Sequence, residues 1–274
     1  MIKPGEIQQK AREIGVRDQQ IEKDYILSWV LKGTAMHEQL SKIIVFNGGT
    51  VLKKIYFEGY RFSEDLDFTL LDNSISNDRV FSMFRETFEY VMEEVNIPLG
   101  IIDNNESEDT HRLDGQGSIN FYISYSGPLG GTGSNKKVKV DISKSEKLEF
   151  PPAINQAILS YSDIEAHELL CYPLEEVLVE KMRTVMQRMQ ARDFYDIWYL
   201  LEIYEMDVNF YLNEFSNKCK SKGLNPHDFP KKLAERVPQY KGRWKSSMSE
   251  QIQDLPDFDK VEREVQRHLK KLKF

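Results

Sequence analysis

FNGGTVLKKIYFEGYRFSEDLDFTL, residues 46–70, contains the two features on which a fold prediction for this chain depends. The first is a glycine turn, Gly48-Gly49-Thr50, which closes an apolar run and leads into a predicted helix. Glycine lets a backbone approach a ligand closely, and a helix start offers unpaired N–H groups to an anion. The turn is therefore suited to hold a phosphate group, with the Thr50 hydroxyl as a further donor.

The second feature is the pair Asp65 and Asp67, which project from one face of a predicted strand because side chains alternate along it. Two such carboxylates repel each other unless a cation neutralises them, and Mg²⁺ prefers carboxylate and phosphate oxygens. The strand-like segment 136–143 alternates in the same way and places Asp141 on the side away from its apolar residues. If the two strands are neighbours, three carboxylates converge, which is enough for a two-metal site.

A D-x-D pair alone has two other interpretations. It occurs at solvated strand ends, and glycosyltransferases use it to hold a metal ion and a nucleoside diphosphate. The glycine turn upstream favours a site for a nucleoside triphosphate and its metal ions, because the turn would contact the phosphates while the aspartates contact the metals.

The composition indicates a globular protein of a reducing compartment. The chain has 274 residues, of which 40% are hydrophobic and 30% charged, and its two cysteines, Cys171 and Cys219, lack metal-binding spacing. No apolar run approaches the roughly 20 residues that span a bilayer, and the N-terminal residues do not resemble a signal peptide. We therefore expect a cytoplasmic protein without membrane contact.

The net charge of −7 excludes a surface that attracts nucleic acid as a whole. Any contact with RNA must use local groups of lysines, such as those within 136–139 or in the tail 267–274. The alternative for both groups is an ordinary solvated surface.

The order of the predicted elements indicates an α+β fold. Apolar residues near the helical period over 18–32 predict a helix that Asp18 caps and Gly33 closes. The next predicted elements are a strand over 43–46, a helix over 50–57, a strand from 65, a helix over 78–96, strands over 118–126 and 136–143, and a glycine-rich connection over 127–135. After Pro151-Pro152 the pattern is mostly helical, so we expect a core over 1–160 and a helical domain over 161–274.

Three charged residues of the predicted helical half lie on or beside apolar faces. Lys181 occupies the i+7 position of an apolar stripe that begins at Leu174, so its ammonium must either snorkel to solvent or meet an anion. Asp193 and Asp196 lie one turn apart beside the apolar face of the following helix. One explanation is structural, with Asp193 as the N-cap and Asp196 stabilised by the helix dipole.

The aromatic residues of the strand over 118–126 also have two interpretations. Phe121, Tyr122 and Tyr125 are of a type that can stack on a nucleobase, but packing within the sheet is the favoured prediction for all three.

Six segments occur in the order expected for a known family. They are IEKDYILSWVL (21–31), FNGGTVLKKIY (46–56), RFSEDLDF (61–68), KVD (139–141), EEVLVEKMRTV (175–185) and RDFYDIWYL (192–200). Together they resemble the AbiEii/AbiGii toxin branch of the DNA polymerase β-type nucleotidyltransferases, which belongs to bacterial type IV toxin–antitoxin and abortive-infection systems. Residues 205–274 match no segment of that branch, and Thr50 replaces the serine of the wider superfamily's glycine-serine signature.

The resemblance implies a polymerase β-like core with a mixed sheet flanked by helices, and a helical domain that completes the active site. It implies transfer of a nucleoside monophosphate from NTP to RNA, such as a tRNA 3′ end, with a cognate antitoxin as partner. The implied cofactor is Mg²⁺, or Mn²⁺ in its place, held by Asp65, Asp67 and Asp141.

The same resemblance assigns further residues. The implied catalytic residues are Asp65, Asp67, Asp141, Lys181, Asp193 and Asp196. The implied nucleotide-binding residues are Gly48, Gly49, Thr50, Lys53, Ser63, Lys139 and Lys181. In this scheme Lys181 contacts phosphate. One of the aspartates in the RDFYD segment either holds Lys181 or Arg192 in place or acts as the base that activates the acceptor hydroxyl.

Two other functions stay open at this point. A D-x-D glycosyltransferase that uses a nucleotide sugar leaves Asp141 and the glycine turn unexplained. A nucleotide-binding interaction protein without turnover would not need intact carboxylates. Metal-dependent transfer of label from an α-labelled NTP separates all three functions.

Overall fold

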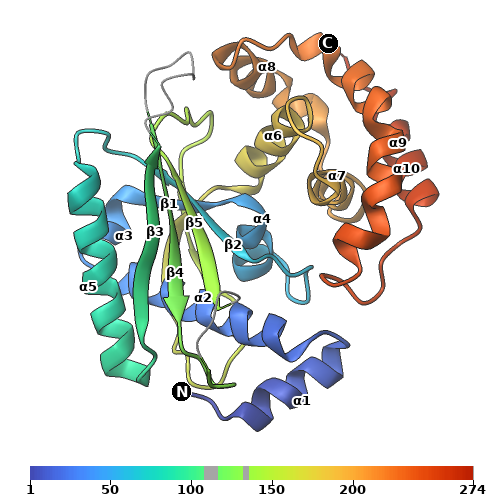
Figure 1. Ribbon diagram of the computed structural model, residues 1–274. Helices are drawn as coiled ribbons and strands as arrows, with labels where there is room; N and C mark the ends of the chain where they lie inside the picture. The colour runs from blue at the N-terminus through green and yellow to red at the C-terminus, as the bar shows by residue number, and fades with distance from the viewer. Residues whose placement is uncertain (108–116, 132–135, 274) are drawn as a thin grey trace. The chain divides into compact units, whose positions relative to one another are not determined.

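The computed structural model describes residues 1–107, 117–131 and 136–273, which divide into two units (Figure 1). We call Met1–Glu146 with Pro152–Cys171 the sheet unit, and Lys147–Pro151 with Tyr172–Phe274 the helical unit. The division falls at Cys171 and not at the predicted residue 160, because a strand of the sheet ends there. The glycine-rich connection predicted over 127–135 lies partly outside the described residues.

Within the described residues, the sheet unit contains a mixed sheet of seven strands in the order β3-β4-β5-β2-β1-β7-β6. The strands are β1 (Ile44–Asn47), β2 (Asp65–Leu70), β3 (Leu99–Ser107), β4 (Ser118–Tyr125), β5 (Lys137–Ser143), β6 (Ala153–Gln156) and β7 (Glu168–Cys171). The β2–β5 and β1–β7 pairs are parallel, and the other pairs are antiparallel. The strand with Asp141 lies beside the strand with Asp65, which is the condition that the sequence had left open for the three carboxylates to lie near one another.

One face of this sheet is buried because its residues alternate between apolar and polar. Three apolar residues of β5 are fully buried, namely Val138, Val140 and Ile142. The residues between them are partly exposed. Helix α5 (Asn77–Val95) covers this buried face, where the rings of Phe84 and Phe121 lie 5.1 Å apart (Figure 1). The polar side chains of β2, β4 and β5 therefore lie on the opposite face.

The ends of helix α5 lie close to those predicted from the sequence, and a capping residue fixes each of them. The side chain of Ser76 accepts a hydrogen bond from the Arg79 N–H at 3.2 Å, which satisfies one of the unpaired donors of the first turn. At the other end Asn96 adopts the left-handed conformation with φ of 55°, which stops the helix.

Helix α2 (Asp18–Met36) differs from its prediction at both ends. The N-cap is Arg17, and Asp18 is already helical, so Asp18 does not cap the helix. Gly33 does not end it either. A Cβ at Gly33 would lie 2.7 Å from Cγ2 of Thr87, so the glycine instead allows α2 and α5 to pack closely. Helix α1 (Pro4–Ile14) packs against α2.

The helix predicted over 50–57 begins earlier, at the first glycine of the turn. It consists of α4 (Gly48–Val51) followed directly by the π-helical turn η1 (Leu52–Tyr56). The short α3 (Leu40–Ile43) precedes β1, so that the strand predicted over 43–46 is shifted by one residue. π-helical turns within helices occur frequently at functional sites.

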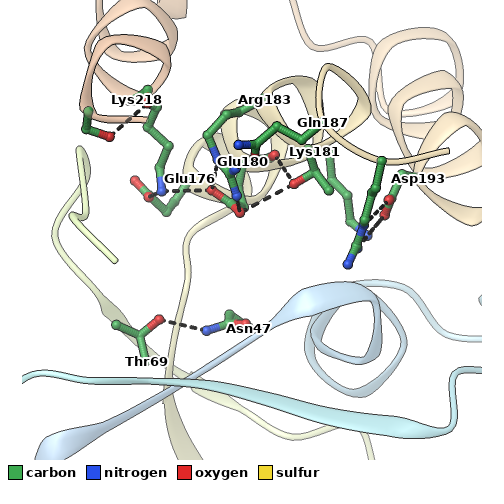
Figure 2. A network of polar contacts seen from close by, with 12 residues as sticks. Asn47, Thr69, Glu176, Glu180, Lys181, Arg183, Gln187, Asp193 and Lys218 are labelled. Carbon is green, nitrogen blue, oxygen red and sulfur yellow. Dashed lines mark hydrogen bonds and ion pairs between the residues drawn. The ribbon is translucent and has the colours of Figure 1, made fainter. Parts of the chain in front are cut away.

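The helical unit confirms the prediction of a mostly helical C-terminal half. Its elements are α6 (Leu174–Val185), α7 (Ala191–Trp198), η2 (Tyr199–Ile203), η3 (Val208–Tyr211), α8 (Leu212–Ser221), η4 (Pro226–Asp228), α9 (Phe229–Met248) and α10 (Phe258–Leu269). The segment 147–151 belongs to this unit because the buried Glu176 carboxylate accepts the N–H groups of Glu149 and Phe150 at 3.0 and 2.9 Å. Lys218 neutralises that carboxylate at 2.8 Å (Figure 2).

Three strands were not predicted. β6 and β7 are four residues each, too short for a clear alternation of apolar and polar residues. β3 includes the polar run Asp103-Asn104-Asn105, which has low strand propensity. None of the described helices is both long enough and apolar enough to cross a membrane.

Candidate functional site

The sheet brings Asp65, Asp67 and Asp141 onto one face of two neighbouring strands. In the parallel pairing of β2 with β5, Asp67 lies directly opposite Asp141, and Asp65 lies opposite Lys139. All four side chains alternate with buried apolar residues and are partly exposed. We call the side of β2 and β5 that carries Asp65, Asp67, Lys139 and Asp141 the carboxylate face.

Lys139 is the cation of this face. Its Nζ donates to Oδ2 of Asp141 at 2.6 Å. Partial burial acts to lower the pKa of Lys139, but the hydrogen bond to Asp141 and the charges of Asp141, Asp65 and Asp67 outweigh it and raise the pKa above its ordinary value. Lys139 is thus held in its charged form by the three carboxylates together.

The glycine turn lies directly against one of these carboxylates. Gly48 has φ of +76°, a conformation that residues with a side chain rarely adopt. A Cβ at Gly48 would lie 2.1 Å from Oδ2 and 2.8 Å from Cβ of Asp67. Gly48 is therefore required twice, once for the backbone conformation and once for the space that Asp67 occupies. The sequence had predicted glycine here for another reason, the close approach of the backbone to a phosphate.

Thr50 has a contact that the sequence did not predict. Its side chain is fully buried, and its hydroxyl donates to the backbone oxygen of Asp65 at 2.6 Å. In this structure the hydroxyl thus connects the glycine turn to the start of β2, where the sequence had predicted a donor to phosphate. At the other end of the turn, Nδ2 of Asn47 donates to the Thr69 hydroxyl at 2.9 Å (Figure 2).

The remaining predicted nucleotide-binding residues of the sheet unit are mostly enclosed. Lys53 donates to the backbone oxygen of Tyr60 at 3.1 Å, and its Nζ lies 4.0 Å from the ring centroid of Phe62. Gly49 and Ser63 are buried. Direct contact between these residues and a nucleotide stays a prediction.

The oxygen donors of the carboxylate face fit a hard divalent cation in type, because carboxylates on adjacent strands are what Mg²⁺ binds. Their side chains are not gathered around one point, however. Among the described residues, no three His, Cys, Asp or Glu side chains form a group that could hold a metal ion. The contacts above give the physical reason, since Asp141 is bonded to Lys139 and Asp67 lies over Gly48.

Three consecutive charged residues of α2 hold the segments that carry this site, and the sequence had not indicated a role for them. Glu22, fully buried, accepts the Leu129 N–H at 2.8 Å and pairs with Lys136 at 2.8 Å, next to the start of β5. Lys23 pairs with Glu64 at 2.7 Å, one residue before β2. We call Glu22, Lys23 and Asp24 the α2 anchors.

The third anchor, Asp24, pairs with Lys54 of the helix that follows the glycine turn. The distance from Oδ2 to Nζ is 2.8 Å, and both side chains are 3% exposed. Tyr161 donates to the same carboxylate at 2.8 Å, and Lys54 also donates to the Ser28 hydroxyl at 2.8 Å. Burial acts to raise the pKa of Asp24, but Lys54 outweighs it and keeps the pKa below its ordinary value. The available indication in the sequence was a pair of acids, Glu22 and Asp24, separated by one residue in a helix that is buried on nearly every side.

In the helical unit, Lys181 contacts two anions. Of the two alternatives that the sequence left for its ammonium, snorkelling to solvent or pairing with an anion, the second is correct. Its Nζ lies 2.7 Å from Oδ1 of Asp193 and 2.7 Å from Oδ2 of Asp196, and all three residues are buried (Figure 2). Arg188, which the sequence analysis did not identify, pairs with Asp193 at 2.9 Å. Lys181 does not snorkel to solvent; it joins α6 to α7.

The charges of this cluster stabilise one another. Burial acts to raise the pKa of Asp193, but Lys181 and Arg188 outweigh it and hold the pKa well below its ordinary value. The alternative that Asp193 is the N-cap is wrong, because the N-cap of α7 is Gln190 and Asp193 lies in the first turn. The prediction that an aspartate of the RDFYD segment holds Lys181 is met by both aspartates.

Known proteins resemble this chain both in sequence and in fold. A family model described as "Nucleotidyl transferase AbiEii toxin, Type IV TA system" matches residues 29–265. JHP933 from Helicobacter pylori is 16% identical with a TM-score of 0.57, over 93% of this chain and 92% of that chain. The nucleotidyltransferase toxin MenT4 from Mycobacterium tuberculosis H37Rv is 17% identical with a TM-score of 0.58, over 100% and 91%. At these identities the two structures show a shared fold. No curated protein matches.

Proposed function

We propose, from the premise that this chain belongs to the AbiEii family of nucleotidyltransferase toxins, that it transfers a nucleoside monophosphate from NTP to RNA. Family membership makes the chain a toxin nucleotidyltransferase with a nucleotide substrate and a cognate antitoxin. The metal ion, the acceptor and the roles of single residues are the finer parts of the proposal.

The observation that carries the proposal is the register of β2 and β5, which sets Asp67 opposite Asp141 on the face that also bears Asp65. We propose that these three carboxylates hold Mg²⁺, or Mn²⁺ in its place. When bound, such a cation neutralises phosphate charge and stabilises the leaving pyrophosphate. Lys139 holds one oxygen, Oδ2, of the Asp141 carboxylate. If a bound cation took that oxygen, the released Lys139 ammonium would become available to a phosphate oxygen.

The glycine turn has a defined part in this proposal. Gly48 brings backbone to within contact of Asp67, so a phosphate held by the N–H groups of α4 would lie beside the carboxylates that hold its metal ion. Thr50 supports the arrangement indirectly, because its hydroxyl fixes the backbone at Asp65.

The acceptor that we propose is RNA, with the tRNA 3′ end as the first candidate, which is the target class that the family resemblance implies. An acceptor of this kind and NTP are both cytoplasmic, so we propose that the enzyme acts in the cytoplasm. The net charge of −7 implies that RNA contacts are local, and transfer should therefore fall steeply with added salt.

The experiment that tests the proposal is label transfer from each α-labelled NTP to total RNA and to total protein, with Mg²⁺, Mn²⁺ or a chelator. We expect metal-dependent labelling of RNA, and a decrease of roughly 10²-fold or more in Asp67→Ala and Asp141→Ala. Labelling of protein alone would replace the proposed acceptor. Full activity of either variant would remove that residue from the site.

Family membership also decides between the functions that the sequence left open. A glycosyltransferase that uses a nucleotide sugar is excluded, because the family model that matches residues 29–265 describes nucleotidyltransferases. A nucleotide-binding protein without turnover is disfavoured for the same reason, because the model describes a transferase.

A further inference from the structure

The aromatic residues of β4 separate into two groups in the structure. Phe121 and Tyr125 are 1% and 5% exposed and point to the buried face, as sheet packing predicts. Tyr122 points to the opposite side and is partly exposed. Packing within the core therefore explains the first two residues and leaves Tyr122 without that explanation.

Tyr122 belongs to the same polar surface as the carboxylate face. The pairing of β4 with β5 sets Tyr122 opposite Lys139, which is itself opposite Asp65 on β2. The next row consists of Asn120, Asp141 and Asp67. Adjacent strands lie about 4.8 Å apart, so Tyr122 is about 10 Å from Asp65 across the sheet. A nucleotide whose phosphate lies at the carboxylates reaches that distance with its base.

An ammonium group accompanies the Tyr122 ring. Nζ of Lys137 lies 4.1 Å from the ring centroid, within the range of a cation–π contact. An aromatic ring beside a lysine, on a polar strand face, is the combination by which proteins stack a base and hold its phosphate.

We propose that Tyr122, with Lys137, forms a stacking platform for a nucleobase at the edge of the carboxylate face. This inference rests on the proposed function, because the nucleotide must lie at the carboxylates. The base belongs either to the incoming NTP or to the terminal nucleotide of the RNA acceptor. Stacking accepts every base, so the platform positions a nucleotide and does not select one.

The test compares Tyr122→Leu with Tyr122→Phe, which keeps the ring. In transfer assays we expect Tyr122→Leu to raise KM about tenfold or more for one substrate, with kcat little changed, and Tyr122→Phe to behave as wild type. An increase in KM for NTP assigns the platform to the incoming nucleotide, and an increase in KM for RNA assigns it to the acceptor. Phe121→Leu is the matched control on the same strand, and it should lower stability without changing either KM.

A binding measurement separates this inference from the proposed function. Two probes are used: 2-aminopurine riboside triphosphate, and a short RNA ending in 2-aminopurine. Stacking on Tyr122 should quench the fluorescence of one probe with wild type and Tyr122→Phe, and much less with Tyr122→Leu. Equal quenching by all three proteins would overturn the platform, and so would a loss of quenching in Tyr122→Phe as large as that in Tyr122→Leu. In either case, transfer activity of the wild type would still support the proposed function. Quenching that depends on the ring in a protein without transfer activity supports the platform and overturns the function.

Discussion

A substitution at Gly48 should have two effects, strain in the backbone and crowding of Asp67, and the same substitution at Gly59 should have only the first. Gly48→Ala places a Cβ against Asp67 and also forces a side chain into positive φ, whereas Gly59→Ala, with φ of +71° and nothing within 4 Å, does only the latter. We expect the free energy of unfolding to fall by roughly 1–2 kcal/mol in Gly59→Ala, because of the cost of the left-handed conformation, and to fall further in Gly48→Ala. Urea unfolding measures both. Only Gly48→Ala should lose transfer activity, and equal activity of the two variants would contradict the close contact.

Lys181 gives a second prediction, which corrects a simple expectation from the apolar stripe. Methionine suits that stripe, but Lys181→Met removes the ammonium that Asp193 and Asp196 both contact and leaves the two carboxylates buried. We therefore expect the free energy of unfolding to fall by about 3–5 kcal/mol. The fluorescence of Trp198 and Trp244, both in the helical unit, reports this unfolding. The triple variant with Asp193→Asn and Asp196→Asn should recover much of the stability. If the triple variant still binds NTP like wild type, Lys181 does not contact phosphate.

The same cluster predicts a dependence on pH. The pKa of Asp193 is lowered in the folded protein from an ordinary value of 3.8, so its carboxylate contributes stability that is present above that value. This contribution is lost as the pH falls below 3.8 towards the folded pKa. Urea unfolding of the helical unit between pH 7 and pH 3 should show the decrease. The triple variant, which has no carboxylate at residues 193 and 196, should show a smaller one.

At the scale of elements, α2 is the helix that positions the site. Its anchors hold the loop before β5, the residue before β2 and the helix after the glycine turn. Asp24→Asn leaves Lys54 charged and buried, so we expect the free energy of unfolding to fall by about 3–5 kcal/mol. Urea unfolding monitored by the fluorescence of Trp29 measures this change. Lys23→Ala removes a more exposed pair and should cost less than about 1 kcal/mol.

The double variant Asp24→Asn, Lys54→Met distinguishes positioning from stability. Removing both charges should recover much of the stability, because no charge stays buried without a partner. If α2 positions the glycine turn, kcat should stay low in this stable variant while KM for NTP changes less. Full recovery of kcat would give the Asp24–Lys54 pair a role in stability alone.

At the scale of the whole molecule, a toxin nucleotidyltransferase should arrest growth when it is expressed without its antitoxin. The arrest should depend on the carboxylate face, because the chemistry takes place there. Expression of wild type should stop growth in a strain without the antitoxin, and expression of Asp65→Ala, Asp67→Ala should not. Colony counts, together with immunoblots that show equal protein levels, measure the effect. Arrest that persists in the double variant would contradict an enzymatic mechanism of toxicity.

The local features of this protein could be predicted from its amino-acid sequence. The alternation in β2 and β5 placed three carboxylates away from the apolar core, and the spacing in α6 placed Lys181 among apolar residues. These predictions held because the period of side chains along a strand or helix is a property of the backbone. The glycine turn was recognised because glycine lets a backbone approach a ligand closely, which is a property of the residue itself.

The contacts between segments distant in the sequence could be known only from the folded chain. The pairing of Asp67 with Asp141, the contact of Gly48 with Asp67, the two aspartates on Lys181 and the α2 anchors all join residues distant in sequence. Strands of four residues, such as β6 and β7, are likewise stabilised by their neighbours and not by their own sequence. The physical reason is that the partner of a charge or of a strand edge depends on how whole elements pack, and no local period encodes that packing.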